Sequence, residues 1–280
     1  MEIKLIALDL DGTLLLPDKT LSEENKRILA KAAQAGGIYI TLATGRPYSG
    51  IKKILEWLPC IRYVVLSNGA VVQDTQTGKI IAKHFVDTKD ALAFYDYADS
   101  QELTVDFFAQ GNRIVSPKWK TCIEQMDISE GTKQLLLSNC TVVENQRIYL
   151  KSLSGVEKIS VRFQNEASKN QYYGKMEALF PQLKICSSLE TNVEATCSNV
   201  TKASGIQDLV SYLGIGMDSV MAFGDNGNDY EMIETAGLGI AMGNADEDIK
   251  KIANRITKSN TEDGVAYMVK EVLGWQQELL

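Results

Sequence analysis

Two acidic clusters in this sequence stand where apolar runs end. The first, Asp9-Leu10-Asp11-Gly12-Thr13, follows the run Ile3–Leu8. Alternate side chains of a β-strand share a face, so the carboxylates of Asp9 and Asp11 would leave the strand end together. The alternative is that Asp11-Gly12 only forms a turn. Ligands of open α/β sheets bind at the carboxyl ends of the strands, so the pattern favours acid–base, nucleophilic or metal chemistry there.

The second cluster, Gly224-Asp225-Asn226-Gly227-Asn228-Asp229, follows the apolar stretch Ser219–Phe223 and opens a predicted helix. Four carboxylates that converge in a low-dielectric cleft would repel one another, so they need a compensating cation. Mg²⁺ suits a site of carboxylate and carbonyl oxygens with a substrate phosphate. The sequence therefore predicts a Mg²⁺ site formed by Asp9, Asp11, Asp225 and Asp229.

Groups that could bind an anion lie near other predicted strand ends and helix starts. Thr44-Gly45-Arg46 ends the predicted strand Ile38–Thr44 and offers a hydroxyl and a guanidinium group. A plain strand-to-helix turn with a surface arginine is the alternative. Lys202 begins a predicted helix and would add a positive charge.

The elements that must position these residues alternate between apolar strands and amphipathic helices. This pattern covers residues 1–82 and 190–280, including a predicted strand over 191–196, and it indicates an α/β fold with a Rossmann-like, doubly wound parallel sheet. Residues 83–189 instead predict hairpins and helices of an α+β module. A sheet that stops and later resumes predicts one discontinuous core domain, 1–82 and 190–280, with the domain 83–189 inserted into it.

Composition limits the classes of function. The chain has 280 residues, of which 45% are hydrophobic, enough for two modest cores. Its net charge of −7 and the lack of long runs of like charge argue against nucleic acid and anionic membranes as partners. The five scattered cysteines contain no CxxC pair, and no leader-like or membrane-spanning stretch is visible, so we expect a cytoplasmic protein that acts on small molecules. Nothing in the sequence indicates the oligomeric state.

Four segments resemble, in order, the four motifs of the haloacid dehalogenase (HAD) superfamily. They are DLDGT at 9–13, LATGR at 42–46, the lysine of NVTKASG at 202, and GDNGND at 224–229. SNGA at 67–70, the insertion after it and GLGIAMGNADEDIK at 237–250 resemble the Cof-type phosphatases, which carry a large C2 cap domain. Lys202 is kept, although the residues beside it differ from the GVSKG that is common in the family.

The resemblance implies a role for each matching residue. Asp9 would be the nucleophile that forms an aspartyl-phosphate, and Asp11 would act as general acid and then as general base. Asp9, Asp225 and the backbone carbonyl of Asp11 would bind Mg²⁺, with support from Asp229. Phosphate or substrate would be bound by Thr44, Gly45, Arg46, Asn68, Lys202 and Asn228.

The predicted function is that of a Mg²⁺-dependent phosphatase of small phosphorylated metabolites, such as sugar or cofactor phosphates. Within the family that the sequence resembles, an aspartate at the position of Asp11 implies phosphate-ester hydrolysis or mutase chemistry. The alternatives are a phosphomutase or phosphotransferase that uses the same site, and a non-catalytic sensor that keeps the phosphate pocket. The sequence leaves open the physiological substrate and the cap residues that would select it.

Overall fold

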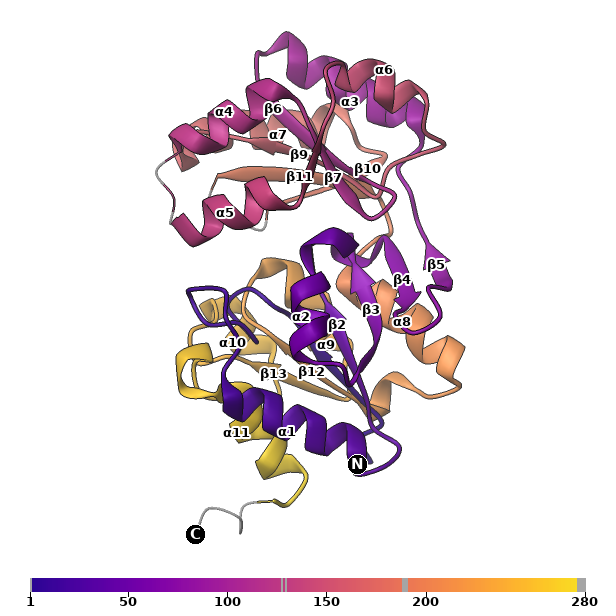
Figure 1. Ribbon diagram of the computed structural model, residues 1–280, viewed down its shortest axis with the longest axis vertical. Coiled ribbons are helices and arrows are strands. Elements are labelled where there is room, and N and C mark those ends of the chain that lie inside the picture. Colours follow the sequence, from indigo (N-terminus) through magenta and orange to yellow (C-terminus); the bar gives the residue numbers. More distant parts are fainter. Residues whose placement is uncertain (1, 127, 129, 188–190, 276–280) are drawn as a thin grey trace. The chain divides into compact units, whose positions relative to one another are not determined.

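A computed structural model describes residues 2–126, 128, 130–187 and 191–275 (Figure 1). The chain divides into two compact units. We call the first the core unit; it comprises Met1–Thr44, Lys53–Ala82 and Thr201–Leu280. We call the other the second unit; it comprises Gly45–Lys52 and Lys83–Val200.

The core unit is built on an eight-stranded sheet in the order β14-β13-β12-β1-β2-β3-β4-β5. The strands in that order are Arg255–Ile256, Leu238–Ala241, Val220–Gly224, Leu5–Leu8, Tyr39–Ala43, Ile61–Leu66, Val71–Asp74 and Ile80–Lys83. From β14 to β3 neighbouring strands are parallel, whereas β4 runs antiparallel to β3. β1 lies fully buried near the middle, as a strand covered on both faces should.

Helices cover both faces of this sheet (Figure 1). They are α1 (Glu23–Gln34), α2 (Lys52–Trp57), α8 (Lys202–Leu213), α9 (Tyr230–Thr235), α10 (Glu247–Ile252) and α11 (Gly264–Val272). α1 packs against α11, while α9 packs against α8 and α10. Ser22 caps α1 by accepting a hydrogen bond from the Asn25 amide. The predicted doubly wound core is therefore present.

The second unit is a six-stranded sheet with helices, in the order β10-β11-β9-β6-β7-β8. Its strands are β6 (Thr104–Ala109), β7 (Asn112–Val115), β8 (Cys140–Val142), β9 (Lys158–Arg162), β10 (Leu183–Cys186) and β11 (Asn192–Cys197). Its helices are α3 (Thr88–Ser100), α4 (Pro117–Gln125), α5 (Glu130–Ser138), α6 (Gln146–Lys151) and α7 (Glu166–Leu179). One face of the sheet is apolar, and Phe107, Ile159 and Val193 on it form a buried core with Phe94 and Met176.

The strand predicted over 191–196 was wrongly expected in the core sheet. It forms β11, which pairs antiparallel with β9 and β10 of the second unit. Its side chains alternate between apolar Val193 and Ala195 and polar Glu194 and Thr196, which is the pattern of an antiparallel strand with one apolar face. The chain therefore enters the core unit at Thr201. The boundary predicted between 189 and 190 lies outside the described residues.

Candidate active site

The two acidic clusters meet because the strands that carry them are neighbours. β1 and β12 are parallel and adjacent, with Leu8 opposite Phe223. Asp9 continues this pairing, since its amide donates to the Phe223 carbonyl at 3.1 Å. Asp9, Asp225 and Asp229 each offer a carboxylate oxygen within 4.8 Å of the others. The predicted convergence of carboxylates at this edge of the sheet is thus seen for three of the four aspartates.

The fourth aspartate, Asp11, lies at the rim of this group. Its carboxylate accepts a 2.8 Å ion pair from Lys19, and both side chains are partly exposed. Asp11 is absent from the three-carboxylate group found among the described residues, although its charge helps to raise the pKa of Asp225. An exposed ion pair of this kind contributes little stability, so it does not fix the carboxyl of Asp11 in place.

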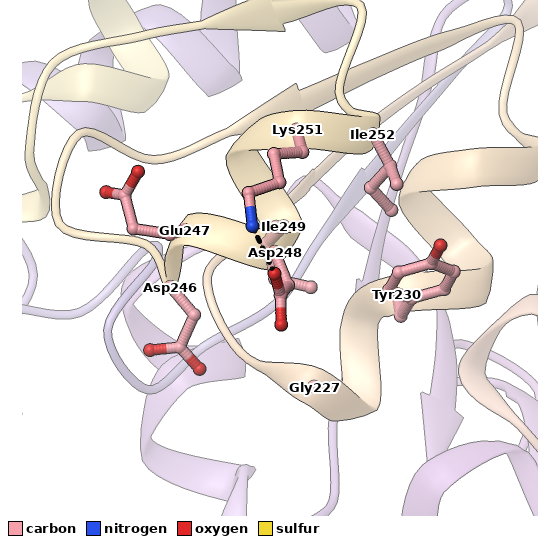
Figure 2. A pocket seen from close by; sticks show the side chains of 8 residues that line it. All are labelled: Gly227, Tyr230, Asp246, Glu247, Asp248, Ile249, Lys251 and Ile252. Carbon is pink, nitrogen blue, oxygen red and sulfur yellow. Dashed lines mark hydrogen bonds and ion pairs between the residues drawn. The ribbon is translucent and has the colours of Figure 1, made fainter.

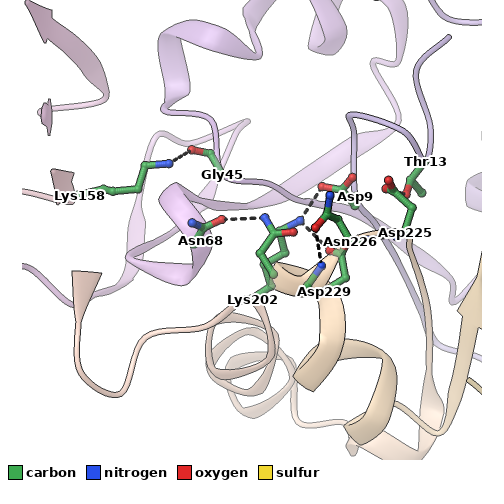
Figure 3. A network of polar contacts seen from close by, with 11 residues as sticks. Asp9, Thr13, Gly45, Asn68, Lys158, Lys202, Asp225, Asn226 and Asp229 are labelled. Atoms are coloured by element: carbon green, nitrogen blue, oxygen red, sulfur yellow. Dashed lines mark hydrogen bonds and ion pairs between the residues drawn. The ribbon is translucent and has the colours of Figure 1, made fainter. Parts of the chain in front are cut away.

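Lys202 binds two carboxylates of this group, those of Asp9 and Asp229 (Figure 3). It is the first residue of α8, whose N-cap Thr201 forms a reciprocal capping box with Ser204. Its Nζ donates at 2.6 Å to Asp9 Oδ1 and at 2.6 Å to Asp229 Oδ1, and the lysine side chain is only 1% exposed. A buried ammonium needs such partners, because an unpaired charge would be costly in the interior.

Asp229 uses both of its oxygens within the protein. Oδ1 binds Lys202, and Oδ2 accepts the backbone amides of Asp225 and Asn226 at 3.1 and 3.2 Å. These bonds fold the loop after β12 around the carboxylate. Asp229 therefore orients Lys202 and the loop that carries Asp225.

Burial and the nearby negative charges shift the pKa values of the site residues. Burial is the main cause that raises the pKa of Asp9 well above its usual value; Lys202 opposes it, and Asp229 and Asp225 add to it. Burial and the charge of Asp229 raise the pKa of Asp225 to about 6, against a hydrogen bond from Thr13 that lowers it. Burial lowers the pKa of Lys202, but Asp229 and Asp9 outweigh it, so the net shift is upward. The site therefore has excess negative charge that a cation would relieve.

Gly12 and Thr13 form the turn that brings Asp225 close to β1. Gly12 has φ +93°, and a Cβ there would collide with the Asp225 carboxylate. Thr13 Oγ1 donates to Asp225 Oδ1 at 2.7 Å. Only glycine can adopt this backbone and leave the carboxylate its space, which is the role expected for the turn.

Thr44 and Asn68 lie at the ends of β2 and β3. Thr44 is 1% exposed; its amide donates to Val65, and its carbonyl accepts the Asn68 amide at 3.0 Å. The Asn68 side chain accepts a 3.3 Å hydrogen bond from Asn228 Nδ2. The structure therefore links three of the predicted phosphate-binding residues. Gly45 and Arg46 group with the second unit, where Arg46 Nη1 donates to the Gly50 carbonyl at 3.2 Å.

Residue-type reasoning missed one residue that supports the turn after β1. Asn244 Nδ2 donates to the Gly12 carbonyl at 2.8 Å, and its Oδ1 accepts the Asn260 amide at 2.9 Å. In the sequence, Asn244 is marked only by its place in the 237–250 segment, which resembles the Cof-type phosphatases. Asn244 fixes the peptide beside Thr13 and so contributes to the shape of the site.

A pocket elsewhere in the core unit is a poor candidate for an anion. It lies between Gly227, Tyr230 and the residues of α10 and its start (Figure 2). Asp246, Glu247 and Asp248 give it an acidic lining, and Lys251 is paired with Asp248 at 2.8 Å. It contains none of the predicted site residues. The carboxylate group around Lys202 remains the better candidate.

The donor set of that group suits a hard divalent cation. The three aspartates of the group offer carboxylate oxygens, which Mg²⁺ and Ca²⁺ prefer to nitrogen or sulfur. Since both oxygens of Asp229 are already engaged, Asp9 and Asp225 are the side chains best placed to bind the ion directly.

Comparison with known proteins gives consistent matches over nearly the full chain. A family model described as haloacid dehalogenase-like hydrolase matches residues 6–269. Phosphatase YwpJ of Bacillus subtilis (strain 168) is 31% identical, covering 97% of this chain and 100% of that protein. The 5-amino-6-(5-phospho-D-ribitylamino)uracil phosphatase YcsE of the same organism is 30% identical, covering 96% of each.

The fold is also shared with solved structures. A haloacid dehalogenase-like hydrolase from B. subtilis superposes with a TM-score of 0.85 and 28% identity, covering 99% of this chain and 100% of that one. The similarity therefore includes both units of the chain.

Proposed function

Because this chain belongs to the haloacid dehalogenase-like hydrolase family, we propose that it is a Mg²⁺-dependent phosphatase of small phosphorylated metabolites that works through an aspartyl-phosphate on Asp9. Family membership makes it an enzyme of the HAD hydrolase type. The observation that carries the finer proposal is the group of Asp9, Asp225 and Asp229 around the buried Lys202. That arrangement combines a nucleophile, a cation site and a fixed positive charge.

Asp9 is the nucleophile of the proposed reaction. One of its oxygens attacks the phosphorus of the ester; the new O–P bond forms as the bond to the leaving alkoxide breaks. Lys202 holds Asp9 Oδ1 at 2.6 Å and so fixes the orientation of the carboxylate. The Thr44 hydroxyl lies at the neighbouring strand end and donates to a phosphoryl oxygen. Positioning and charge stabilisation account for most of the catalysis of phosphoryl transfer.

Asp11 is the general acid and base. Its carboxyl gives a proton to the leaving oxygen, and the resulting carboxylate then takes a proton from the water that attacks the aspartyl-phosphate. The second step regenerates Asp9 and releases inorganic phosphate. Its partial exposure and surface ion pair with Lys19 leave Asp11 able to change partner during this cycle.

Asp9, Asp225 and the Asp11 carbonyl would hold Mg²⁺. Bound there, the ion would neutralise charge on the carboxylates and on the phosphoryl oxygens. The raised pKa values of Asp9 and Asp225 support this assignment, because burial and then the neighbouring carboxylates disfavour the charged forms, which a bound cation would stabilise.

The substrate class follows from the relatives. YcsE is named as a phosphatase of 5-amino-6-(5-phospho-D-ribitylamino)uracil, while YwpJ is named only as a phosphatase. We propose that this chain also hydrolyses a phosphate monoester of a small metabolite, a sugar or cofactor phosphate. No helix among the described residues is long and apolar enough to cross a membrane. The cytoplasmic location stays a prediction from the sequence.

Replacing Asp9 by Asn tests the nucleophile. We expect kcat for a generic phosphomonoester such as p-nitrophenyl phosphate to fall by about 10³-fold or more, since an amide does not form the covalent intermediate. The thermal unfolding midpoint should stay near that of the unmodified chain. Release of phosphate with Mg²⁺ and without any acceptor would also separate hydrolysis from phosphotransfer. Turnover that survives in Asp9→Asn contradicts the proposal.

A further inference from the structure

The second unit holds the segment Gly45–Lys52 at two points. Lys158 Nζ, at the start of β9, donates to the Gly45 carbonyl at 2.9 Å (Figure 3). Gly111, in the turn between β6 and β7, accepts the Ser49 amide at 2.8 Å through its carbonyl. The Gly111 amide in turn donates to Glu157 Oε1 at 2.7 Å, which fixes that turn. The segment that follows β2 is therefore held at Gly45 and again at Ser49.

Lys158 is a charged residue whose side chain is buried in the sheet. Its side chain is 2% exposed and pairs with Glu194 Oε1 at 2.7 Å, and its ammonium lies 4.6 Å from the centre of the Phe108 ring. Glu194 also accepts from Asn192 Nδ2 at 3.0 Å. A buried ion pair is weak evidence for stability, since apolar residues of similar volume often replace one at little cost. Besides this pair, Lys158 uses a further donor on the Gly45 carbonyl, which orients the peptide that follows Gly45.

The Gly45 carbonyl belongs to the residue immediately after Thr44. On the other side, the Thr44 carbonyl accepts the Asn68 amide. Since the C=O and N–H of a trans peptide point in opposite directions, that bond aims the Gly45 N–H away from Asn68. The two hydrogen bonds together fix the peptide planes on both sides of the Gly45 Cα. They set the direction of the Gly45 amide and restrict the backbone that carries the Thr44 hydroxyl.

We propose that Lys158 is a positioning residue for phosphate binding: through the Gly45 carbonyl it holds the Thr44–Gly45 turn so that the Thr44 hydroxyl and the Gly45 amide donate to the same phosphoryl group. This inference rests on the proposed function. Neither Lys158 nor Glu194 contacts the reacting atoms in this scheme. Their effect passes through the backbone of the turn.

The test replaces the ion pair without leaving a buried charge. Lys158→Met with Glu194→Gln removes both charges together and keeps side-chain length. We expect kcat/KM for p-nitrophenyl phosphate to fall by about ten- to a hundredfold, because small displacements of a positioning group have effects of this size. The inhibition constant for inorganic phosphate should rise, since the same donors bind the product. Arg147→Met serves as the control, because it removes an arginine–aspartate pair (Arg147 with Asp96) in the same unit away from the segment.

A double-mutant cycle separates positioning from a general structural role. In a Thr44→Ala background the Lys158/Glu194 replacement should lower kcat/KM by a smaller factor. The Thr44 hydroxyl, which Lys158 is proposed to position, is already absent there. Fully additive losses, or a loss of activity matched by Arg147→Met, would overturn the inference. So would unchanged kcat/KM and phosphate inhibition in the double replacement. In that case Asp9→Asn would still be inactive, which leaves the proposed function intact; an active Asp9→Asn would instead refute the proposed function.

Discussion

At the scale of single residues, the site depends on how Lys202 balances the charge around it. Its ammonium bonds Asp9 and Asp229 at 2.6 Å each, and all three side chains are buried. Asp225 adds a third negative charge nearby, with a pKa raised to about 6 by burial and by Asp229. One lysine thus offsets part of the charge of three carboxylates. The remainder is the negative charge that the proposed divalent cation would neutralise.

Lys202→Met should destabilise the fold as well as the reaction. Removal of one partner leaves Asp9 and Asp229 buried without a counter-charge, which costs about 3–5 kcal/mol in buried pairs. Chemical denaturation at neutral pH would measure the loss. It should shrink at acidic pH, where the carboxyls can take up protons.

The matched control for this change is Lys251→Met. Lys251 forms a 2.8 Å pair with Asp248, but both side chains are exposed. We expect the denaturation midpoint of that variant to stay unchanged within error. If both substitutions lowered the free energy of unfolding equally, the burial of Lys202 would add nothing to the stability that its ion pairs contribute.

At the scale of elements, the site is assembled by the close packing of α8 against the turn Ser67–Gly69. Gly69 has φ +107°, and a Cβ there would collide with the Thr201 carbonyl at the N-cap of α8. Gly205, one turn into the helix, also faces the turn: a Cβ there would stand 3.1 Å from the Gly69 Cα. The missing side chains let the helix start approach the turn that carries Asn68. That approach places Lys202 beside the β1 strand end.

Gly69→Ala should therefore push α8 away from the turn. The added methyl group meets a backbone carbonyl that cannot rotate aside, so we expect a loss of about 3 kcal/mol or more from strain and overpacking together. Phosphatase activity should fall as well, because Lys202 moves with the helix. Denaturant unfolding and steady-state kinetics would measure the two effects.

Gly78→Ala is the control for backbone strain alone. Gly78 has φ +72°, but nothing lies within 4 Å of its Cβ position. We expect it to cost about 1–2 kcal/mol, the usual cost of a left-handed residue, and to leave kcat unchanged. If Gly69→Ala were no worse than Gly78→Ala, the close approach would not constrain the site.

At the scale of the whole molecule, cation binding and folding should be linked through pH. The pKa of Asp225 is raised to about 6 in the cation-free chain, above its value in an unfolded chain. The native state therefore holds more protons than the unfolded state between about pH 4 and pH 6, and this group makes the cation-free protein less stable as pH rises through that window. Bound at the proposed site, Mg²⁺ would relieve the repulsion once the proton has left.

Mg²⁺ should thus raise the unfolding midpoint more at about pH 8 than at about pH 5. At a concentration about 100 times Kd, binding to the native state adds about 2.7 kcal/mol. At the lower pH the ion must displace a proton from Asp225, whose pKa is about 6, so binding weakens by about tenfold and the gain should fall to about half. Scanning calorimetry with Mg²⁺ or with a chelator at both pH values would measure it.

Asp225→Asn is the control for this linkage. It removes the titrating group and one proposed ligand, so the added stability from Mg²⁺ should be small at both pH values. A Mg²⁺ effect of equal size at the two pH values in the unmodified chain would contradict the assignment of Asp225 as a ligand.

The sequence by itself determined the core fold, the membership of the HAD family and the identity of the acidic cluster. Those features are local, because each acidic cluster has its apolar strand, its glycine and its aspartate, Asp9 or Asp225, close together in the chain. Neighbouring parallel strands then bring the two clusters together at the same edge of the sheet. It misplaced β11, because an isolated strand does not reveal which sheet it joins. Three contacts were decided only by the tertiary structure. Both carboxylate oxygens of Asp229 accept hydrogen bonds, one from Lys202 and one from the loop after β12. Asp11 pairs with Lys19, and Lys158 donates to the Gly45 carbonyl. Each of these depends on side-chain direction and on contacts between distant residues, which composition and spacing do not specify.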